Sequence, residues 1–155
     1  MKSMKYILIL FLLITSCKES SESKSSSNKD YKVAVDFIND YNKEFLKPKS
    51  ETSQWLSKNK SVTINLINKH MQILDSARIS DPELGLDFDP ILNAQDSDEN
   101  GFEIKKIDSL LGFVTVRGKS IPNFEITLKV IEKNGTTLVD GAGIVNIPKS
   151  KLHKN

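Results

Sequence analysis

The stretch NFEITLKVIEKNGTTLVDGAGIVNI, residues 123–147, decides the fold. Its first part alternates apolar and polar residues, which predicts a strand over 123–132 with one buried face. That face comprises Phe124, Ile126, Leu128 and Val130. Asn134-Gly135 is a strong hairpin signal because both residues tolerate a positive φ. The chain then returns as a second strand over 136–147, so the stretch predicts an antiparallel hairpin.

Two further strands are expected upstream of this hairpin, within residues 102–119. Before them, apolar residues follow helical spacing. This spacing predicts a helix capped by Asp30 and ended by Pro48, then a short helical turn at 52–56 and a longer helix capped by Ser61. The apolar face expected of the longer helix comprises Leu66, Ile67, Met71, Leu74 and Ala77, with His70 among them. Helices followed by an antiparallel meander indicate an α+β fold, with N-terminal helices packed on a curved antiparallel sheet.

Glycines and a proline mark the end of the last strand. Gly141 and Gly143 predict a bulge or a bend within it, and Pro148 stops further pairing. Residues 149–155 are predicted to form a frayed polar C-terminal tail. A single α+β domain is therefore expected over residues 31–148.

Length and charge restrict the class of protein. The chain has 155 residues, enough for one ordinary domain. Its formal net charge of +2 argues against binding to nucleic acid through a broad basic face. Removal of residues 1–16 would take away Lys2 and Lys5, leaving 20 basic residues to balance the 20 acidic ones. Cys17 is the single cysteine, which excludes an intrachain disulfide framework and a cysteine-rich zinc site.

The N-terminus has the zones of a secretory signal peptide. Two lysines precede Tyr6 to Ile14, an apolar run too short to span a bilayer. Ile14-Thr15-Ser16-Cys17 resembles the bacterial lipobox. The resemblance implies a lipoprotein signal peptide over 1–16, cleavage between Ser16 and Cys17, and diacylglycerol and palmitate-type acyl chains on Cys17. Several acyl chains give stable anchoring to a lipid bilayer. The alternatives are an ordinary secreted protein with a chance cysteine, or a buried structural cysteine.

Residues 17–30 follow as a lipidated cysteine and a tether. Residues 18–30, KESSESKSSSNKD, contain no apolar side chain and are expected to be flexible. Lys18 rather than aspartate follows Cys17, which resembles the sorting pattern of outer-membrane lipoproteins. We therefore expect export across the inner membrane and lipid anchoring in the bacterial cell envelope, at the outer membrane. Periplasmic and surface-exposed orientations both stay open.

Two segments of the domain carry a resemblance to a lipoprotein family. One is Asp87-Phe88-Asp89-Pro90…Ala94-Gln95-Asp96, which follows the early helices. The other is Thr137-Leu138-Val139-Asp140-Gly141…Val145-Asn146-Ile147-Pro148. Over roughly 31–148 the chain resembles the uncharacterised YbjP/YqhG-like lipoproteins of the nuclear-transport-factor-two-like superfamily. The resemblance implies a cone-like α+β fold with a pocket between sheet and helices. It implies no activity, because that superfamily includes both enzymes and plain binders.

The segment Asp96-Ser97-Asp98-Glu99-Asn100-Gly101 matches the first half of a calcium loop. Asp96, Asp98 and Asn100 would supply alternating oxygens, and Gly101 would permit the sharp turn. The glutamate needed at the twelfth position is replaced by Ile107. A solvated acidic turn is therefore the alternative, and calcium is the only cofactor that the sequence suggests.

The acidic stretch over residues 80–100 is the second candidate site. A loop of this length is either functional or contains a short helix, for which Pro90 to Ala94 capped by Asp89 is the candidate. Neighbouring carboxylates here are candidates for acid and base chemistry. The possible pocket residues are His70, Asp87, Asp89, Gln95, Asp96 and Asp140. The aromatic residues that line either an apolar pocket or the core are Phe37, Tyr41, Trp55 and Phe88. The favoured interpretation is that Asp89 caps a helix, that Asp96 and Asp98 shape a turn, and that His70 is a core histidine with one hydrogen bond.

The sequence contains no nucleophile elbow, glycine-rich phosphate loop or zinc-protease motif, so no catalytic residue is assigned. The favoured hypothesis is a membrane-anchored envelope lipoprotein that acts as a non-enzymatic binding module. Its partner would be an envelope protein, a peptide or a small ligand. One alternative is an envelope hydrolase or isomerase that uses Asp87, Asp89 and His70. Another is an immunity-type inhibitor of an envelope toxin.

Overall fold

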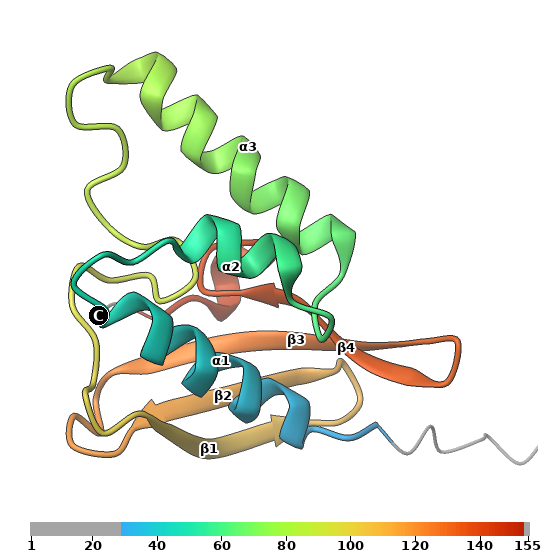
Figure 1. Cartoon of the computed structure of the whole chain (residues 1–155). Coiled ribbons are helices and arrows are strands. Elements are labelled where there is room, and N and C mark those ends of the chain that lie inside the picture. The colour runs from blue at the N-terminus through green and yellow to red at the C-terminus, as the bar shows by residue number, and fades with distance from the viewer. Residues whose placement is uncertain (1–28, 154–155) are drawn as a thin grey trace, which may run out of the picture.

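The computed structural model describes residues 29–153 (Figure 1). The predicted signal peptide, its cleavage site at Ser16 and Cys17, and residues 18–28 of the tether lie outside these described residues. Three helices precede four strands: α1 (Lys32–Phe45), α2 (Thr52–Lys58), α3 (Ile64–Ser80), β1 (Phe102–Asp108), β2 (Phe113–Gly118), β3 (Glu125–Lys133) and β4 (Thr136–Ala142). A short 3-10 helix, Lys149–Lys151, follows. Within residues 29–153 we find no helix with the length and apolar character that crossing a membrane requires.

The four strands form one antiparallel sheet in the order β1-β2-β3-β4. The hairpin predicted at Asn134-Gly135 joins β3 to β4, and both residues have a positive φ. Near Gly141 the register shifts: Lys129 pairs with Gly141 and Val130 pairs with Val139. Asp140 is therefore the extra residue of a β-bulge, which bends and twists the sheet. The α+β class and the bulge predicted in the last strand are both confirmed.

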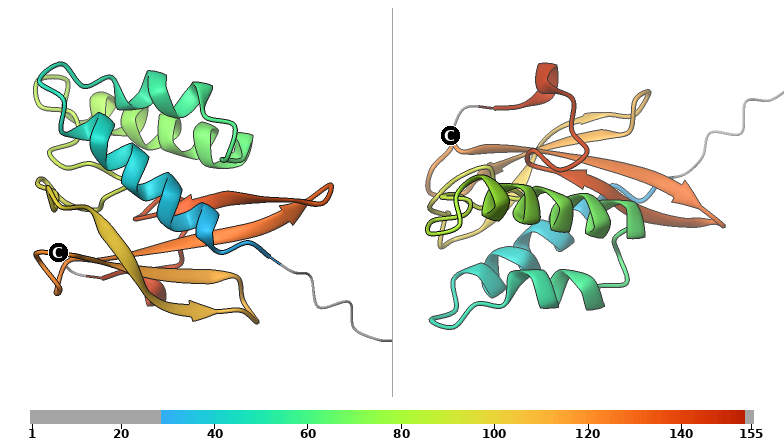
Figure 2. Two further views of the ribbon diagram at one scale, coloured as in Figure 1. Left: turned by 60° about the horizontal axis from the view of Figure 1, so that its bottom comes forward. Right: turned by 90° about the horizontal axis from the view of Figure 1, so that it is seen from above.

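The core lies between this sheet and α1, which crosses one face of it (Figures 1 and 2). The alternation predicted for β3 is confirmed, since Phe124, Ile126, Leu128 and Val130 are all buried. The buried hydrophobic residues that α1 contributes are Ala34, Phe37, Ile38 and Tyr41. They recur at helical spacing because only one stripe of the helix faces the sheet. Burial of these apolar faces is the main stabilising contribution to the fold.

The helix caps differ from those predicted. Asp30 accepts a hydrogen bond from the backbone N–H of Lys32 at 2.9 Å, but the residue at the N-cap of α1 is Tyr31. Thr63, not Ser61, caps α3: its hydroxyl accepts a hydrogen bond from the N–H of Leu66 at 3.1 Å. The backbone of the preceding segment is already engaged with β4. The Ser61 carbonyl accepts a hydrogen bond from the N–H of Val139, and the N–H of Thr63 donates to the Val139 carbonyl. This contact with the sheet moves the start of the helix two residues along the chain.

Helix α3 buries less than its sequence predicts. Leu66 and His70 are buried, whereas Met71 is exposed and Leu74 and Ala77 are only partly covered. The helix leans away from the sheet, and its C-terminal end projects from the body of the domain (Figures 1 and 2). Only its first half therefore packs on the rest of the protein.

The chain after β4 departs from the prediction of a strand up to Ile147. The strand ends at Ala142, because Gly143 has φ +58° and turns the chain. The following tail is not frayed over residues 149–153. Thr127 on β3 donates a hydrogen bond to the carbonyl of Lys151 at 2.8 Å, and the His153 carbonyl accepts from Asn93 at 2.9 Å. The tail thus covers the face of the sheet opposite to α1 (Figure 2).

Candidate functional site

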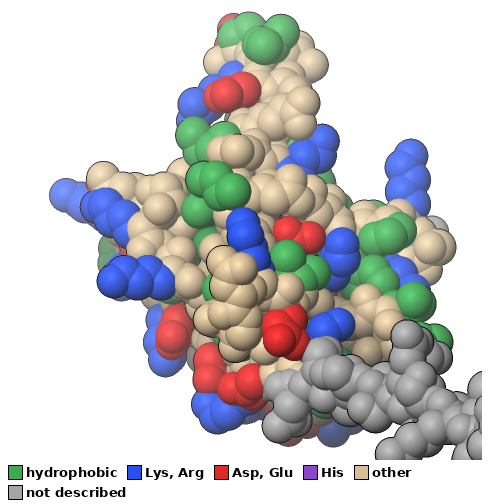
Figure 3. Space-filling model, turned by 90° about the vertical axis from the view of Figure 1, so that its right-hand side faces the viewer, with side chains coloured by type: hydrophobic (Ala, Val, Ile, Leu, Met, Phe, Trp, Pro, Cys, Tyr) green, Lys and Arg blue, Asp and Glu red, His purple; other side chains and the backbone are tan. Residues whose placement is uncertain are grey.

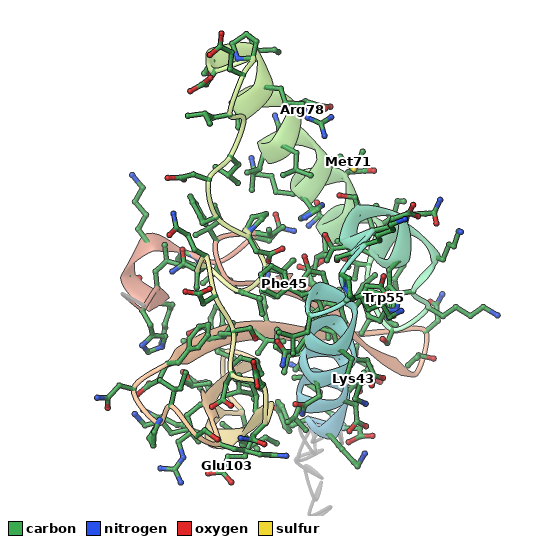
Figure 4. The ribbon with its side chains drawn as sticks, turned by 60° about the vertical axis from the view of Figure 1, so that its left-hand side comes forward. Lys43, Phe45, Trp55, Met71, Arg78 and Glu103 are labelled. Atoms are coloured by element: carbon green, nitrogen blue, oxygen red, sulfur yellow. The ribbon has the colours of Figure 1, made fainter. Side chains whose placement is uncertain are left out.

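A cleft of about 360 Å³ lies where the end of α1, the start of α2, the middle of α3 and residues 86–95 meet. Figure 4 shows Phe45 at this end of α1. Polar lining residues include Thr52, His70, Asp87, Asp89 and Gln95. Four of the six pocket residues predicted from sequence, His70, Asp87, Asp89 and Gln95, therefore meet in one cleft, although they come from segments separated by up to 25 positions.

Asp89 shapes the floor of this cleft through a tight turn. One carboxylate oxygen accepts hydrogen bonds from the N–H groups of Ile91 and Leu92 at 2.9 and 2.8 Å. The predicted capping role of Asp89 is thus present, but the predicted helix over 90–94 is wrong. Asn93 takes a positive φ of 55° and its N–H donates to the Asp89 carbonyl, which closes a single turn. The Pro90 carbonyl instead accepts from the N–H of Ile144 at 2.9 Å.

The second oxygen of Asp89 accepts a hydrogen bond from the Tyr41 hydroxyl at 2.6 Å. Desolvation raises the pKa of Asp89, although its three hydrogen bonds act in the opposite direction. Burial, and then the Asp89 charge, raise the pKa of Tyr41 well above its usual range. Tyr41 also packs against Phe37 and Trp55, with ring centroids 6.0 and 5.8 Å away. These aromatic residues belong to the core or its edge, so the structure favours the core interpretation for them.

We expect Asp89→Ala to lower the free energy of unfolding by about 2 kcal/mol, because the Tyr41 hydroxyl and two N–H groups lose their acceptor. Asp89→Asn is the control. Its amide keeps an oxygen for the turn and can donate to Tyr41, and it removes a carboxylate whose ionisation burial disfavours. Urea unfolding at neutral pH should therefore show a smaller loss in the free energy of unfolding for Asp89→Asn than for Asp89→Ala. Equal losses would contradict this role of the hydrogen bonds.

His70 is the most buried polar side chain of the cleft, with 1% of its surface exposed. Among the described residues, nothing hydrogen-bonds its Nδ1 atom. Desolvation lowers the pKa of His70, which keeps the imidazole neutral at neutral pH. A buried polar atom without a partner is uncommon in native structures and points to a water or a ligand atom that completes it. The expectation that His70 is a core histidine is confirmed, but the hydrogen bond expected with it is not found at Nδ1.

A larger cleft of about 890 Å³ adjoins the first, and both are lined by Phe88 and Gln95. Its other walls come from the turn before β3 and from the docked tail. They include Asn123 and His153, and the predicted pocket residue Asp96 lines this cleft from the loop that carries Gln95. Phe88 and Gln95, which lie on the same loop, therefore form a wall that the two clefts share.

Asp98 does not take part in either cleft, and its position argues against the calcium turn. It is 1% exposed and accepts hydrogen bonds from three backbone N–H groups, those of Asn100, Ser120 and Ile121. The side-chain amide nitrogen of Asn100 donates a hydrogen bond to the Ser120 hydroxyl. Asp96 is exposed. Across residues 29–153 we find no group of three or more acidic, histidine or cysteine side chains that could hold a metal ion.

Asp140 is also absent from the cleft, which corrects the prediction that it is a pocket residue. It occupies the bulge in β4 and accepts a hydrogen bond from the Thr63 hydroxyl at 2.8 Å. The Lys129 ammonium lies 3.4 Å from its other oxygen. Asp140 thus ties the start of α3 to the sheet, which is a structural role.

Sequence reasoning missed several lining residues. Thr52 and Phe45 lie at helix ends, where no motif distinguishes a lining side chain from a surface one. His153 was assigned to a frayed tail, yet its ring contacts Thr127 at 3.1 Å and lies 3.5 Å from Glu125. No sequence signal marks it, because its partners Thr127 and Glu125 lie on a strand that only the fold brings close.

Comparison of the chain with protein-family models, with curated proteins and with solved structures finds no match. The resemblance to the nuclear-transport-factor-two-like lipoproteins therefore stays a prediction.

Proposed function

We propose that this chain is a bacterial envelope lipoprotein, anchored at the outer membrane through acylated Cys17, whose domain is a non-enzymatic binding module. The observation that supports binding is the cleft itself. His70, Asp87, Asp89 and Gln95 converge there, and the Nδ1 atom of His70 is buried without a partner among the described residues. A ligand that donates a hydrogen bond to this nitrogen would complete it.

The same geometry favours binding over catalysis. A general acid or base must reach the proton that it transfers. Both oxygens of Asp89 already accept hydrogen bonds from Tyr41 and from the turn. Asp89 is thus held in place by the fold, whereas the exposed Gln95 and Asp87 are free to contact a ligand at the rim.

Anchoring is tested by Cys17→Ser, which removes the thiol that would accept diacylglycerol. We expect the variant to leave the membrane fraction, because several acyl chains are needed for stable attachment. The measurement is fractionation of cells that express the full chain, with Ser16→Ala as the control that keeps a small residue before the cleavage site. Unchanged membrane retention of Cys17→Ser would contradict the lipid anchor.

Binding is tested with the protein purified from membranes. Affinity capture and native mass spectrometry should find a partner or a bound small molecule in the wild-type sample. Gln95→Ala should lose it, because Gln95 is exposed and lines both clefts. Gln54→Ala, which replaces another exposed glutamine, on α2, that lines neither of these clefts, should retain it. A wild-type protein with no reproducible partner or ligand would count against the binding module, as would equal losses in both variants.

A further inference from the structure

The turn between β1 and β2 presents two leucines to the outside of the domain. Leu110 is 90% exposed and Leu111 is 54% exposed. Among the large hydrophobic side chains of residues 29–153, none is more exposed than Leu110. Turns normally carry small or polar residues there, because side chains at a turn meet water. Adjacent leucines at a turn therefore indicate a surface that is covered in use.

The fold fixes this exposure. Asp108 holds the turn twice: its carbonyl accepts from the N–H of Gly112 at 2.8 Å, and its carboxylate accepts from the N–H of Leu111 at 3.1 Å. Gly112 has φ +74°, and its carbonyl accepts from the N–H of Val130 on β3 at 2.8 Å. The backbone of the turn is thus bonded to the sheet on one side. The leucine side chains stay exposed in this arrangement.

The chain that carries Cys17 enters the domain beside this turn. The Tyr31 hydroxyl donates to the carbonyl of Ser109 at 3.3 Å, and the ammonium of Lys29 lies next to Gly112. Figure 3 looks onto this end of the molecule and shows hydrophobic, basic and acidic side chains on its surface. Residues 18–28 are rich in serine. From this composition and length, we expect an average span of about 18 Å between Cys17 and the turn.

We propose that Leu110 and Leu111 dock on the bilayer that holds the acyl chains of Cys17, so that the turn is a second contact that orients the domain. This inference rests on the lipid anchor proposed above. Burial of leucine at the membrane interface is favourable, and the basic Lys29 lies beside the turn, where anionic headgroups would meet it. The short tether keeps the turn at a high effective concentration near the membrane, so a weak contact is sufficient.

This docking fixes the direction in which the cleft faces. α1 begins at Lys32, next to the docked end, and its 14 residues end at Phe45 in the cleft. A helix of this length spans about 21 Å. The cleft therefore opens at the end of the domain remote from the bilayer, where a partner in the aqueous compartment has access to it.

The far end of α3 supplies a matched control. Ile79 and Leu84 are 82% and 78% exposed, close to the value for Leu110. They lie where α3 and its following loop project away from the body of the domain, on the side opposite to the start of α1 (Figure 1). A bilayer contacted by the β1–β2 turn does not reach them. Non-specific association of exposed apolar side chains with lipid would involve both ends of the domain alike.

The experiment uses the full chain, purified from bacterial membranes and reconstituted into vesicles of phosphatidylethanolamine and phosphatidylglycerol. Leu110→Cys and Leu84→Cys each introduce one free thiol, because acylation blocks Cys17, and an environment-sensitive fluorophore is attached there. We expect the label at 110 to shift to the blue and brighten on reconstitution, while the label at 84 keeps its spectrum in buffer. Adding Leu111→Ser to the 110-labelled chain should weaken the shift, and adding Ile79→Ser should not.

Mass spectrometry of the N-terminal peptide separates the possible failures. If Cys17 carries acyl chains but the label at 110 keeps its buffer spectrum, docking is overturned and the lipoprotein proposal stands. If the labels at 110 and 84 shift equally, oriented docking is overturned as well. If Cys17 is unmodified, the proposed anchor fails, and docking beside it fails with it.

Discussion

Replacing Asp98 with alanine is expected to lower the free energy of unfolding by about 4 kcal/mol. The buried carboxylate accepts hydrogen bonds from the N–H groups of Asn100, Ser120 and Ile121, at 2.9, 2.6 and 2.7 Å. Each hydrogen bond to a charged acceptor contributes about 1.5–3 kcal/mol, and water can replace part of this at the exposed donors. Asp98 joins the turn before β1 to the turn between β2 and β3, so its loss frees two segments at once.

Urea unfolding at neutral pH measures this loss. Asp96→Ala is the matched control, because Asp96 is exposed and its replacement should change the free energy of unfolding by less than about 0.5 kcal/mol. Asp98→Asn should not restore stability, since the nitrogen of its amide would face N–H donors. Losses of similar size for Asp96→Ala and Asp98→Ala would contradict the assigned role.

The dependence of stability on pH in acid provides a second measure of how much the Asp98 carboxylate stabilises the fold. Desolvation acts to raise its pKa, but the N–H groups of Ile121, Ser120 and Asn100, with the nearby Lys119, hold the pKa of Asp98 below its usual range. A carboxylate with a lowered folded-state pKa contributes stability above the pKa of its unfolded state, about 4. That contribution is lost as the pH falls through the lower, folded-state pKa. Asp98→Ala should therefore show a weaker dependence of stability on pH below about 4.

The sheet could be predicted because local signals and burial agree there. Phe124, Ile126, Leu128 and Val130 alternate with polar residues, and each of them faces the core. Asn134-Gly135 encodes the hairpin through backbone preferences that need no tertiary contact. Where the pattern depends on neighbours, the prediction was wrong. The last strand ends at Ala142, since the packing of Gly143 against residues 90–91 turns the chain.

Convergence of the candidate site could be predicted only in part. His70 and Asp89 stand out by residue type, and both line the cleft. Asp98 and Asp140 have the same residue type, but backbone N–H groups and the hydroxyl of Thr63 engage them. Sequence shows which side chains are carboxylates, whereas their partners depend on loops brought together by the fold. For the same reason the docked position of His153 could not be derived from its polar tail.

The cleft depends on one close backbone contact, and Gly143→Ala is expected to remove about 4 kcal/mol of stability by disrupting it. A Cβ at Gly143 would lie 2.3 Å from the carbonyl oxygen of Pro90 and 2.4 Å from that of Ile91. Both atoms belong to the backbone, so neither can rotate away. The residue also has φ +58°, which L-amino acids other than asparagine and aspartate rarely adopt. The added methyl group must therefore push the Asp89 turn off the sheet.

Gly135→Ala separates the two causes, because Gly135 also has a positive φ, of 74°, but a Cβ there meets nothing within 4 Å. It should cost only the backbone strain, about 1 kcal/mol. The excess for Gly143→Ala then measures the contact that holds Pro90 and Ile91 against the sheet. Since Asp89 precedes them and bonds to Tyr41, whose ring packs on Trp55, displacement of the turn should also change the emission of this single tryptophan. Equal losses of stability for the two glycine variants, with tryptophan emission unchanged in both, would show that the turn carrying Asp89 is positioned independently of the sheet.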